Sequence, residues 1–139
     1  MRVLGLDVGD KYIGVAISDE LGMFAQPLMR IDRISNDHAY GEIKKLIDEY
    51  NIKDVVVGLP INMNNTLGPQ SEKVKKFAER LKGKFKINLI YIDERMSSIS
   101  AERVLIEGSV RRENRKKYID KIAASYILQT YLDIHRSSL

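Results

Sequence analysis

The chain has 139 residues, of which 23 are Lys or Arg and 19 are Asp or Glu, and it contains no cysteine. This length predicts one domain over residues 1–139, and a hydrophobic content of 44% is enough to build a core. Thiol nucleophiles, disulfides and zinc–thiolate sites are excluded. Two histidines are too few for a purely histidine-built metal site. The chemistry must therefore come from carboxylates, hydroxyls, amines and the backbone.

Positive charge is concentrated in residues 111–121, here called the basic segment. Six bases against two acids in this stretch equal the whole net charge of +4. Such a concentration favours a polyanionic partner over a diffuse role in solubility. A solvated loop that leads into a helix is the structural alternative.

The N-terminal apolar run is short and is broken by Asp7. Neither a secretory signal nor a membrane span is therefore predicted. We expect a soluble, cytoplasmic protein.

The first half of the chain predicts a meander followed by a helix and a buried strand. Apolar runs at residues 2–8 and 12–18 predict a hairpin, and a weaker extended segment at 24–33 carries Pro27, which indicates a sheet edge. Helical spacing of apolar residues follows over 37–50.

Either Asn36 or Asp37 is expected to cap that first helix. Residues 53–59 have no polar side chain from Val55 onward, which is typical of a parallel strand covered on both faces. A polar loop at 60–68 follows this strand.

The second half alternates helices and strands. Pro69 predicts the start of a helix that continues to about Leu81, and a strand follows at 87–92. A short helix is expected at 97–107 and a final helix at 116–134. The order β-β-β-α-β-α-β-α-α predicts a mixed sheet with helices on both faces.

Asp7 interrupts the apolar run of the first predicted strand, just before a turn at Gly9. A carboxylate beside a hydrophobic strand costs free energy unless a cation meets it. Asp7 is therefore a candidate site residue. An Asx-turn at the strand end is the alternative.

Asp93 and Glu94 come at the end of the strand predicted at 87–92, where open α/β sheets tend to bind ligands. Alternation places the two acids on opposite faces, so we expect only one of them to face a site. A surface ion pair with Arg95 is the alternative. The choice between the two acids stays open at this point.

Asp120 lies in the register of the last predicted helix that also contains Ala123 and Ala124. Two small residues allow a helix to approach the sheet closely, which would carry the Asp120 carboxylate towards the strand ends. An exposed acid in a first helical turn, favoured by the helix dipole, is the alternative.

Three carboxylate sites on separate elements match the oxygen ligands of hard divalent cations such as Mg²⁺. Two such ions about 3.5–4 Å apart can activate a water and stabilise a leaving oxygen in phosphodiester hydrolysis. Together with the basic segment, this favours a metal-dependent nuclease.

Four segments of the chain resemble the YqgF/RuvX family of ribonuclease H-like proteins, described as Holliday junction resolvase-like and as pre-16S rRNA nucleases. They are GLDVGDKYIGVAISD (5–19), VVGLPINMNNTLGPQSEKVKKFAERL (56–81), YIDERMSS (91–98) and RKKYIDKIAASYILQTYLD (115–133). The segments occur in the family's order and the resemblance covers nearly the whole chain.

The resemblance implies a ribonuclease H-like α/β fold, with a five-stranded mixed sheet and helices on both faces. It implies that Asp7, Glu94 and Asp120 are the catalytic residues and hold Mg²⁺ or Mn²⁺, with Asp7 bridging the ions. It also implies a substrate groove lined by Arg95, Ser97, Ser98 and the loop at 58–60. The full set of residues expected to bind nucleic acid is Lys11, Arg95, Ser97, Ser98, Arg111, Arg112, Arg115, Lys116 and Lys117.

The chain departs from the family pattern at three places, one of which is Asn65, where the family often has Gly. The family usually has a basic residue at the position of Tyr12, and Thr-Thr where Ser97 and Ser98 stand. The hydroxyls survive the change to serine. The change at Tyr12 removes one phosphate contact, although Lys11 is adjacent.

The expected activity is hydrolysis of phosphodiester bonds in structured nucleic acid, with 5′-end processing of pre-16S rRNA first and a four-way DNA junction as the alternative. A non-catalytic nucleic-acid-binding module is a further alternative. An ATP-binding protein of the actin and sugar-kinase class is another, although that class closes two such domains around the nucleotide. We expect a monomer or weak homodimer without membrane contact, and a mobile loop at 108–115 that orders on nucleic acid.

Overall fold

The computed structural model describes residues 1–61, 66–93 and 112–137, and it describes the side chains of the last helix from Ile122 to His135. Five strands form one sheet in the order β3-β2-β1-β4-β5. Their bounds are Val3–Val8 (β1), Tyr12–Ser18 (β2), Ala25–Asp32 (β3), Asp54–Leu59 (β4) and Asn88–Asp93 (β5). β2 is antiparallel to β1 and β3, whereas β1, β4 and β5 are mutually parallel. The predicted five-stranded mixed sheet is confirmed.

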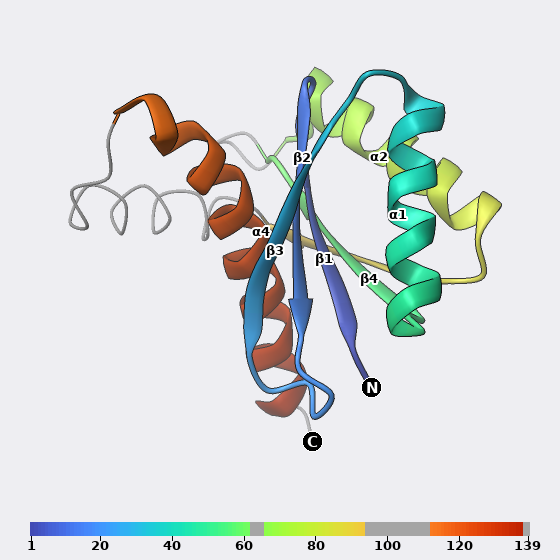
Figure 1. The fold of residues 1–139 in the computed structure, drawn as a ribbon, viewed down its shortest axis with the longest axis vertical. Coiled ribbons are helices and arrows are strands. Elements are labelled where there is room, and N and C mark those ends of the chain that lie inside the picture. The colour runs from blue at the N-terminus through green and yellow to red at the C-terminus, as the bar shows by residue number, and fades with distance from the viewer. Residues whose placement is uncertain (62–65, 94–111, 138–139) are drawn as a thin grey trace.

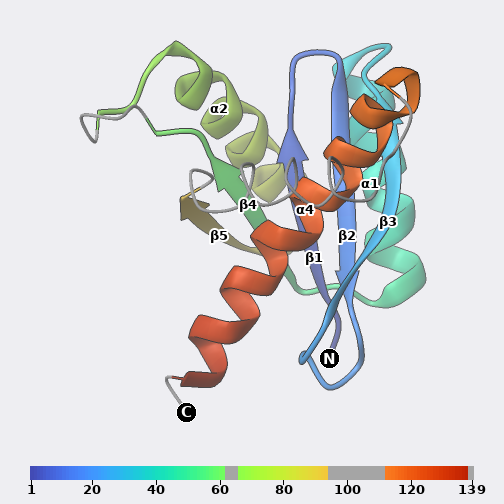
Figure 2. The same ribbon diagram turned by 90° about the vertical axis from the view of Figure 1, so that its left-hand side faces the viewer.

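Three helices in the described part of the chain cover the two faces of the sheet. Helices α1 (Asn36–Tyr50) and α2 (Pro69–Lys84) lie on one face, and α4 (Arg112–Ser137) crosses the other (Figures 1 and 2). None of these helices has the length and apolar character that crossing a bilayer requires. The helix expected at 97–107 lies outside the described residues.

The helix ends differ in detail from the sequence prediction. The cap of α1 is Ser35, not Asn36 or Asp37, because the extended backbone of Ser35 lets its hydroxyl accept the backbone N–H of His38 at 3.1 Å. Helix α2 begins at Pro69 as predicted and continues three residues beyond Leu81. Helix α4 begins at Arg112, four residues before the predicted start.

The face under α1 and α2 carries the larger core. Strand residues such as Leu6, Ile13 and Val57 pack there against Ile43 of α1 and Phe77 of α2. All five side chains are nearly or fully buried. Burial of this apolar area, at about 25 cal/mol per Å², is the main stabilising term of the fold.

The face under α4 carries a smaller core with close backbone contact. A Cβ added to Gly5 of β1 would lie 2.8 Å from Cβ of Leu128, and one added to Gly58 of β4 would lie 2.4 Å from Cδ1 of Ile127. Because Gly5 and Gly58 on neighbouring strands have no side chains, α4 can pack close to the sheet there. Leu128 and Leu132 of α4 are buried in this core.

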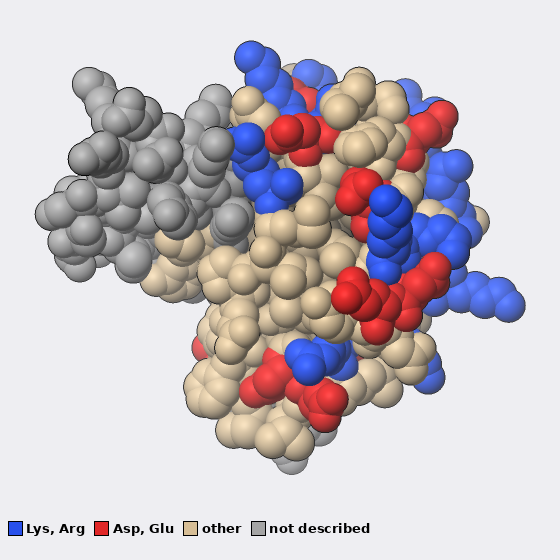
Figure 3. Space-filling model, in the orientation of Figure 1, with Lys and Arg blue, Asp and Glu red and all other residues tan. Residues whose placement is uncertain are grey.

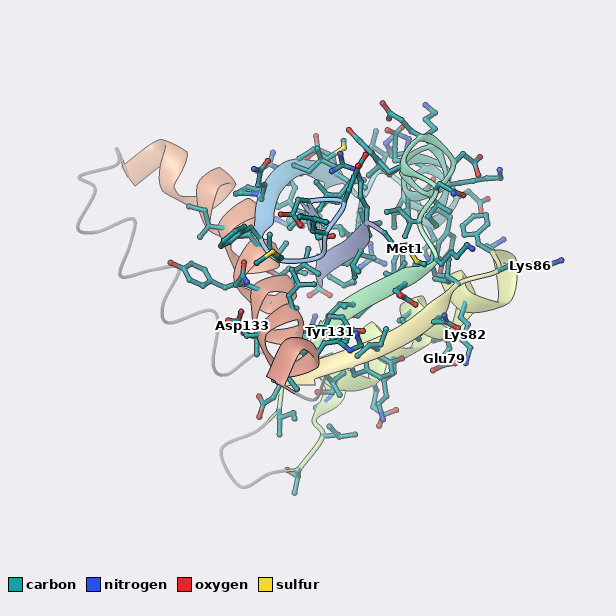
Figure 4. All side chains as sticks on the ribbon, turned by 90° about the horizontal axis from the view of Figure 1, so that it is seen from below. Met1, Glu79, Lys82, Lys86, Tyr131 and Asp133 are labelled. Atoms are coloured by element: carbon teal, nitrogen blue, oxygen red, sulfur yellow. The ribbon has the colours of Figure 1, made fainter. Side chains whose placement is uncertain are left out.

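Helix α4 runs antiparallel to β1. Gly5 faces Ala124 and Leu128, whereas Tyr131 lies further towards the amino-terminal ends of the parallel strands. There the Asp54 carboxylate adds to the effect of burial, which raises the pKa of Tyr131. Figure 4 shows Tyr131 where α4 meets the sheet. The amino-terminal half of α4 therefore extends towards the edge of the sheet at which β1 ends, and it passes over β2 (Figure 2).

Candidate functional site

The carboxyl ends of the three parallel strands lie at one edge of the sheet. Register pairs Leu6 of β1 with Val57 of β4, and Leu59 of β4 with Asp93 of β5. A tight turn joins β1 to β2 at this edge, and the Gly9 N–H donates to the carbonyl oxygen of Tyr12 at 2.9 Å. Ligands of open α/β sheets bind outside such strand ends.

Asp7 lies on the α4 face of the sheet at this edge. Side chains alternate along a strand, so Asp7 shares its face with Val3 and Gly5, both of which pack against α4. Its side chain is half-buried. The structure thus places Asp7 beside α4, the helix that carries Asp120.

Asp120 is helical, and its place along α4 follows from the described turns. It precedes Ala124 by one turn, or about 6 Å of helix, and Ala124 lies over Gly5. Asp7 follows Gly5 by two residues, or about 6.6 Å of strand. Because α4 and β1 have opposite chain directions, residues before Ala124 and residues after Gly5 both lie towards this edge of the sheet. Position 120 of α4 therefore lies further towards this edge of the sheet than Ala124 does, while the Asp120 side chain is outside the described part of the chain.

The ambiguity between Asp93 and Glu94 is narrowed by the register of β5. Leu89 and Tyr91 pack on the core under α1 and α2, whereas Ile90 and Ile92 pack on the core under α4. Asp93 therefore belongs to the α1–α2 face, opposite to Asp7. Glu94 lies outside the described residues.

Arg30 of β3 is a cation that the sequence reasoning missed. It pairs with Gly14 of β2, which pairs with Asp7, so the three residues form one row across the α4 face. The Arg30 guanidinium lies over the ring of Tyr12, 3.8 Å from the centroid, and 3.2 Å from Oδ1 of Asp32. The alternation Met29–Arg30–Ile31 could have signalled a base facing away from the main core.

The predicted nucleic-acid-binding residues fall into three groups. Lys11 is exposed on the β1–β2 turn. Four bases lie in the first two turns of α4, where only the backbone is described: Arg112, Arg115, Lys116 and Lys117. The remaining four lie outside the described residues: Arg95, Ser97, Ser98 and Arg111.

The predicted loop at 108–115 is wrong for residues 112–115, which are helical. Arg, Lys and Glu are good helix formers, so the charge of the basic segment does not prevent helix formation. Residues 108–111 lie outside the described part of the chain. In the view of Figure 3 the described Lys and Arg alternate with Asp and Glu and form no broad patch of one sign.

The donor chemistry fits a hard divalent cation. Asp7 offers two carboxylate oxygens at the strand edge, and the chain has no thiol that would select a softer metal. Within residues 1–61, 66–93 and the described side chains of α4, no group of three or more potential metal ligands comes together. Two of the three predicted ligands, Glu94 and Asp120, are outside that set of side chains.

Comparison with known proteins gives consistent results at the level of sequence. The family described as "RuvX: Holliday junction resolvase" matches residues 1–134. A Thermoanaerobacter pseudethanolicus protein named "Putative pre-16S rRNA nuclease" is 53% identical over 138 residues, which cover 99% of both chains. A Clostridium tetani protein of the same name is 52% identical over 133 residues, or 96% of both chains.

Two solved resolvases have similar folds, at low sequence identity. Thermus thermophilus RuvC in complex with a Holliday junction substrate aligns with a TM-score of 0.63 at 13% identity, covering 99% of this chain and 97% of that one. The fowlpox virus resolvase complex with Holliday junction DNA aligns at 0.58 and 17% identity, covering 97% and 99%. These matches show the ribonuclease H-like fold. The sequence matches show more, and the chain belongs to the RuvX family.

Proposed function

We propose that this protein is a divalent-metal-dependent endonuclease that hydrolyses phosphodiester bonds in structured nucleic acid, with the 5′ end of pre-16S rRNA as its main substrate. The observation that carries the proposal is the placement of Asp7 on the α4 face, at the carboxyl ends of three parallel strands and beside the helix that carries Asp120. The names of relatives about half identical over nearly the full chain support the substrate.

Asp7, Glu94 and Asp120 would hold Mg²⁺ or Mn²⁺. Such ions, when bound, supply activation of a water and stabilisation of the leaving oxygen. The position of Asp93 on the opposite face supports Glu94 as the acid of β5's end that serves the site.

The chain's own cations would bind and orient the polyanion. Lys11 on the turn and Arg30 on the α4 face flank Asp7, and the four bases in the first turns of α4 lead into Asp120. Arg30, held over the ring of Tyr12, would supply the phosphate contact that the family resemblance assigns to a basic residue at position 12. Holding the phosphate between these groups fixes the scissile bond next to the carboxylates.

A four-way DNA junction is the second candidate substrate. It is favoured by the structural likeness to resolvases solved with such junctions. Cleavage of either substrate is hydrolysis of a phosphodiester bond by the same site. A cleavage assay on both substrates is therefore needed to decide between them.

The test is cleavage of a 5′-extended 16S rRNA precursor and of a four-way junction, with Mg²⁺, with Mn²⁺ and with chelator. Wild type should cleave the RNA only with metal. Asp7→Asn should lose roughly 10³-fold in rate, about 4 kcal/mol of transition-state stabilisation, without a lower melting temperature. Asp93→Asn is the matched control and should retain activity.

Each outcome decides between the candidates. Preferred cleavage of the junction would replace the RNA assignment, and binding without cleavage of either substrate would identify a non-catalytic binding module. Full activity of Asp7→Asn would contradict the proposed site.

A further inference from the structure

A cavity of about 270 Å³ lies between α1, α2 and the β1–β2 turn. It is on the side of the sheet opposite α4, yet at the same edge as Asp7, because its wall includes Asp10 of the β1–β2 turn. None of the residues assigned to the proposed nuclease site lines it.

The charge of the cavity is strongly positive. Four cations line it against one carboxylate, Asp10, which lies 3.8 Å from Nζ of Lys73. Lys73, Lys76 and Arg80 are spaced at three and four residues along α2, so they project from one side of the helix. Lys76 and Arg80 form no ion pair with any residue that the structure describes. The cavity therefore has cationic donors in excess of its own acids.

Arg33 is held in place before any ligand arrives. One guanidinium nitrogen donates to the carbonyl oxygen of Gly9 at 2.7 Å, the other to Oδ1 of Asn36 at 2.8 Å. The guanidinium also lies over the ring of Phe77, 4.9 Å from its centroid. A guanidinium has five N–H donors, so donors remain for an anion. Ordering Arg33 in advance reduces the entropy lost on binding.

Two aromatic rings form the floor of the cavity, but their faces are already covered. Tyr40 and Phe77 stack on each other with centroids 4.6 Å apart, and the Tyr40 hydroxyl donates to the carbonyl oxygen of Phe77 at 3.1 Å. Arg33 lies over the second ring, and Lys84 lies over the first. The cavity therefore offers a ligand N–H donors and positive charge rather than a ring on which a base could stack. The start of α1 at Asn36 adds the positive end of a helix dipole.

We propose that this cavity, formed by Arg33, Lys73, Lys76 and Arg80, binds a phosphate group. A phosphate has the charge and the acceptor oxygens that match a fixed guanidinium surrounded by three flexible cations.

The location points to a phosphate of a polynucleotide. Gly9, Asp10 and Lys11 connect the two sides of the sheet edge, so a strand whose scissile bond lies near Asp7 can cross this turn and reach the cavity. This assignment of the source rests on the proposed nuclease function, whereas phosphate binding itself does not.

The direct test is a titration of the ¹⁵N-labelled wild-type protein with inorganic phosphate, followed by amide chemical shifts. Saturable shifts at Asp10, Asn36 and residues 73–76, absent with an equal ionic strength of chloride, are expected. Because this measurement uses wild type, it does not depend on how any variant folds. Shifts that do not saturate, or none, would overturn the proposal.

The source is tested by the salt dependence of RNA binding, measured by anisotropy on a labelled hairpin with a single-stranded 5′ extension. Lys76→Gln/Arg80→Gln should lower the salt slope by about 0.7–1.4, which is roughly 5- to 25-fold in affinity at 0.1 M salt. The control Lys82→Gln/Lys86→Gln removes equal charge at two residues that do not line the cavity, both labelled in Figure 4, and should have little effect.

The two arms separate the possibilities. Phosphate shifts together with weakened RNA binding support a backbone phosphate as the ligand. Phosphate shifts with unchanged RNA binding support a free phosphate compound, and cleavage by wild type then shows independently that the nuclease proposal stands. Loss of binding that is equal in both double variants would overturn a specific site.

Discussion

The two faces of the sheet are built for different purposes. Under α1 and α2, large aliphatic and aromatic side chains form the main core. Under α4, two glycines bring the helix against the backbone, and the same face carries a carboxylate at Asp7 and a guanidinium at Arg30. The main core and the proposed catalytic carboxylates therefore lie on opposite faces of one sheet. Changes to the buried core residues of the first face should affect folding, and changes to Asp7 or Arg30 on the second should affect catalysis or substrate binding.

The largest effect on stability is expected on the α1–α2 face. Ile43→Ala removes a fully buried side chain and leaves a cavity, so it should lower the free energy of unfolding by about 2–5 kcal/mol. Urea denaturation gives this value. Activity per folded molecule, measured well below the melting temperature, should match wild type. A selective loss of activity at full stability would break the division between the faces.

A smaller effect is expected where α4 meets the sheet. Gly58→Ala places a Cβ against the buried Ile127 side chain, which must change its rotamer, and should cost about 1–3 kcal/mol. Gly83→Ala is the matched control: its Cβ would meet nothing within 4 Å, and the change should stabilise helix α2 by about 0.4–1 kcal/mol. Equal effects of the two substitutions in thermal denaturation would refute the close contact at Gly58.

The smallest effect is expected at Arg30. Arg30→Gln removes one proposed phosphate contact, so RNA affinity at 0.1 M salt should fall about fivefold and the salt slope by about 0.7. Arg2→Gln is the control, since Arg2 bonds the backbone of Ser18 near the other edge of the sheet. An unchanged slope for Arg30→Gln would remove this residue from the substrate surface.

Much of the fold could be predicted because burial leaves a periodic trace. The sequence patterns are clear for β1 and β4, whose apolar runs predict strands. They are also clear for α2, where apolar residues at helical spacing predict a helix to about Leu81. The start of α4 could not be predicted in this way, since the residues from Arg112 onward have charge but no apolar period. The choice of Ser35 as the cap could not be predicted, because Ser35, Asn36 and Asp37 can all cap a helix. Which one does so depends on the backbone conformation, and Ser35 is the residue with extended backbone.

The candidate site was visible in part for a similar reason. Asp7 stands out because it breaks an apolar run, whereas Arg30 lies in a segment whose alternation is blurred by Pro27 and a bulge. The choice between Asp93 and Glu94 needs the register of β5, which no local pattern contains. The cationic cavity could not be foreseen, because Arg33 and Arg80 are brought together only by the packing of α1 against α2.

The central claim is that one divalent-cation site lies on the α4 face of the sheet edge. Its most direct test is a Mn²⁺ titration monitored by electron paramagnetic resonance on wild type, Asp7→Asn, Asp120→Asn and Asp93→Asn. We expect a saturable site in wild type, an affinity at least about tenfold lower in the first two variants, and an unchanged affinity in Asp93→Asn. Retained binding in Asp7→Asn together with loss in Asp93→Asn would contradict it.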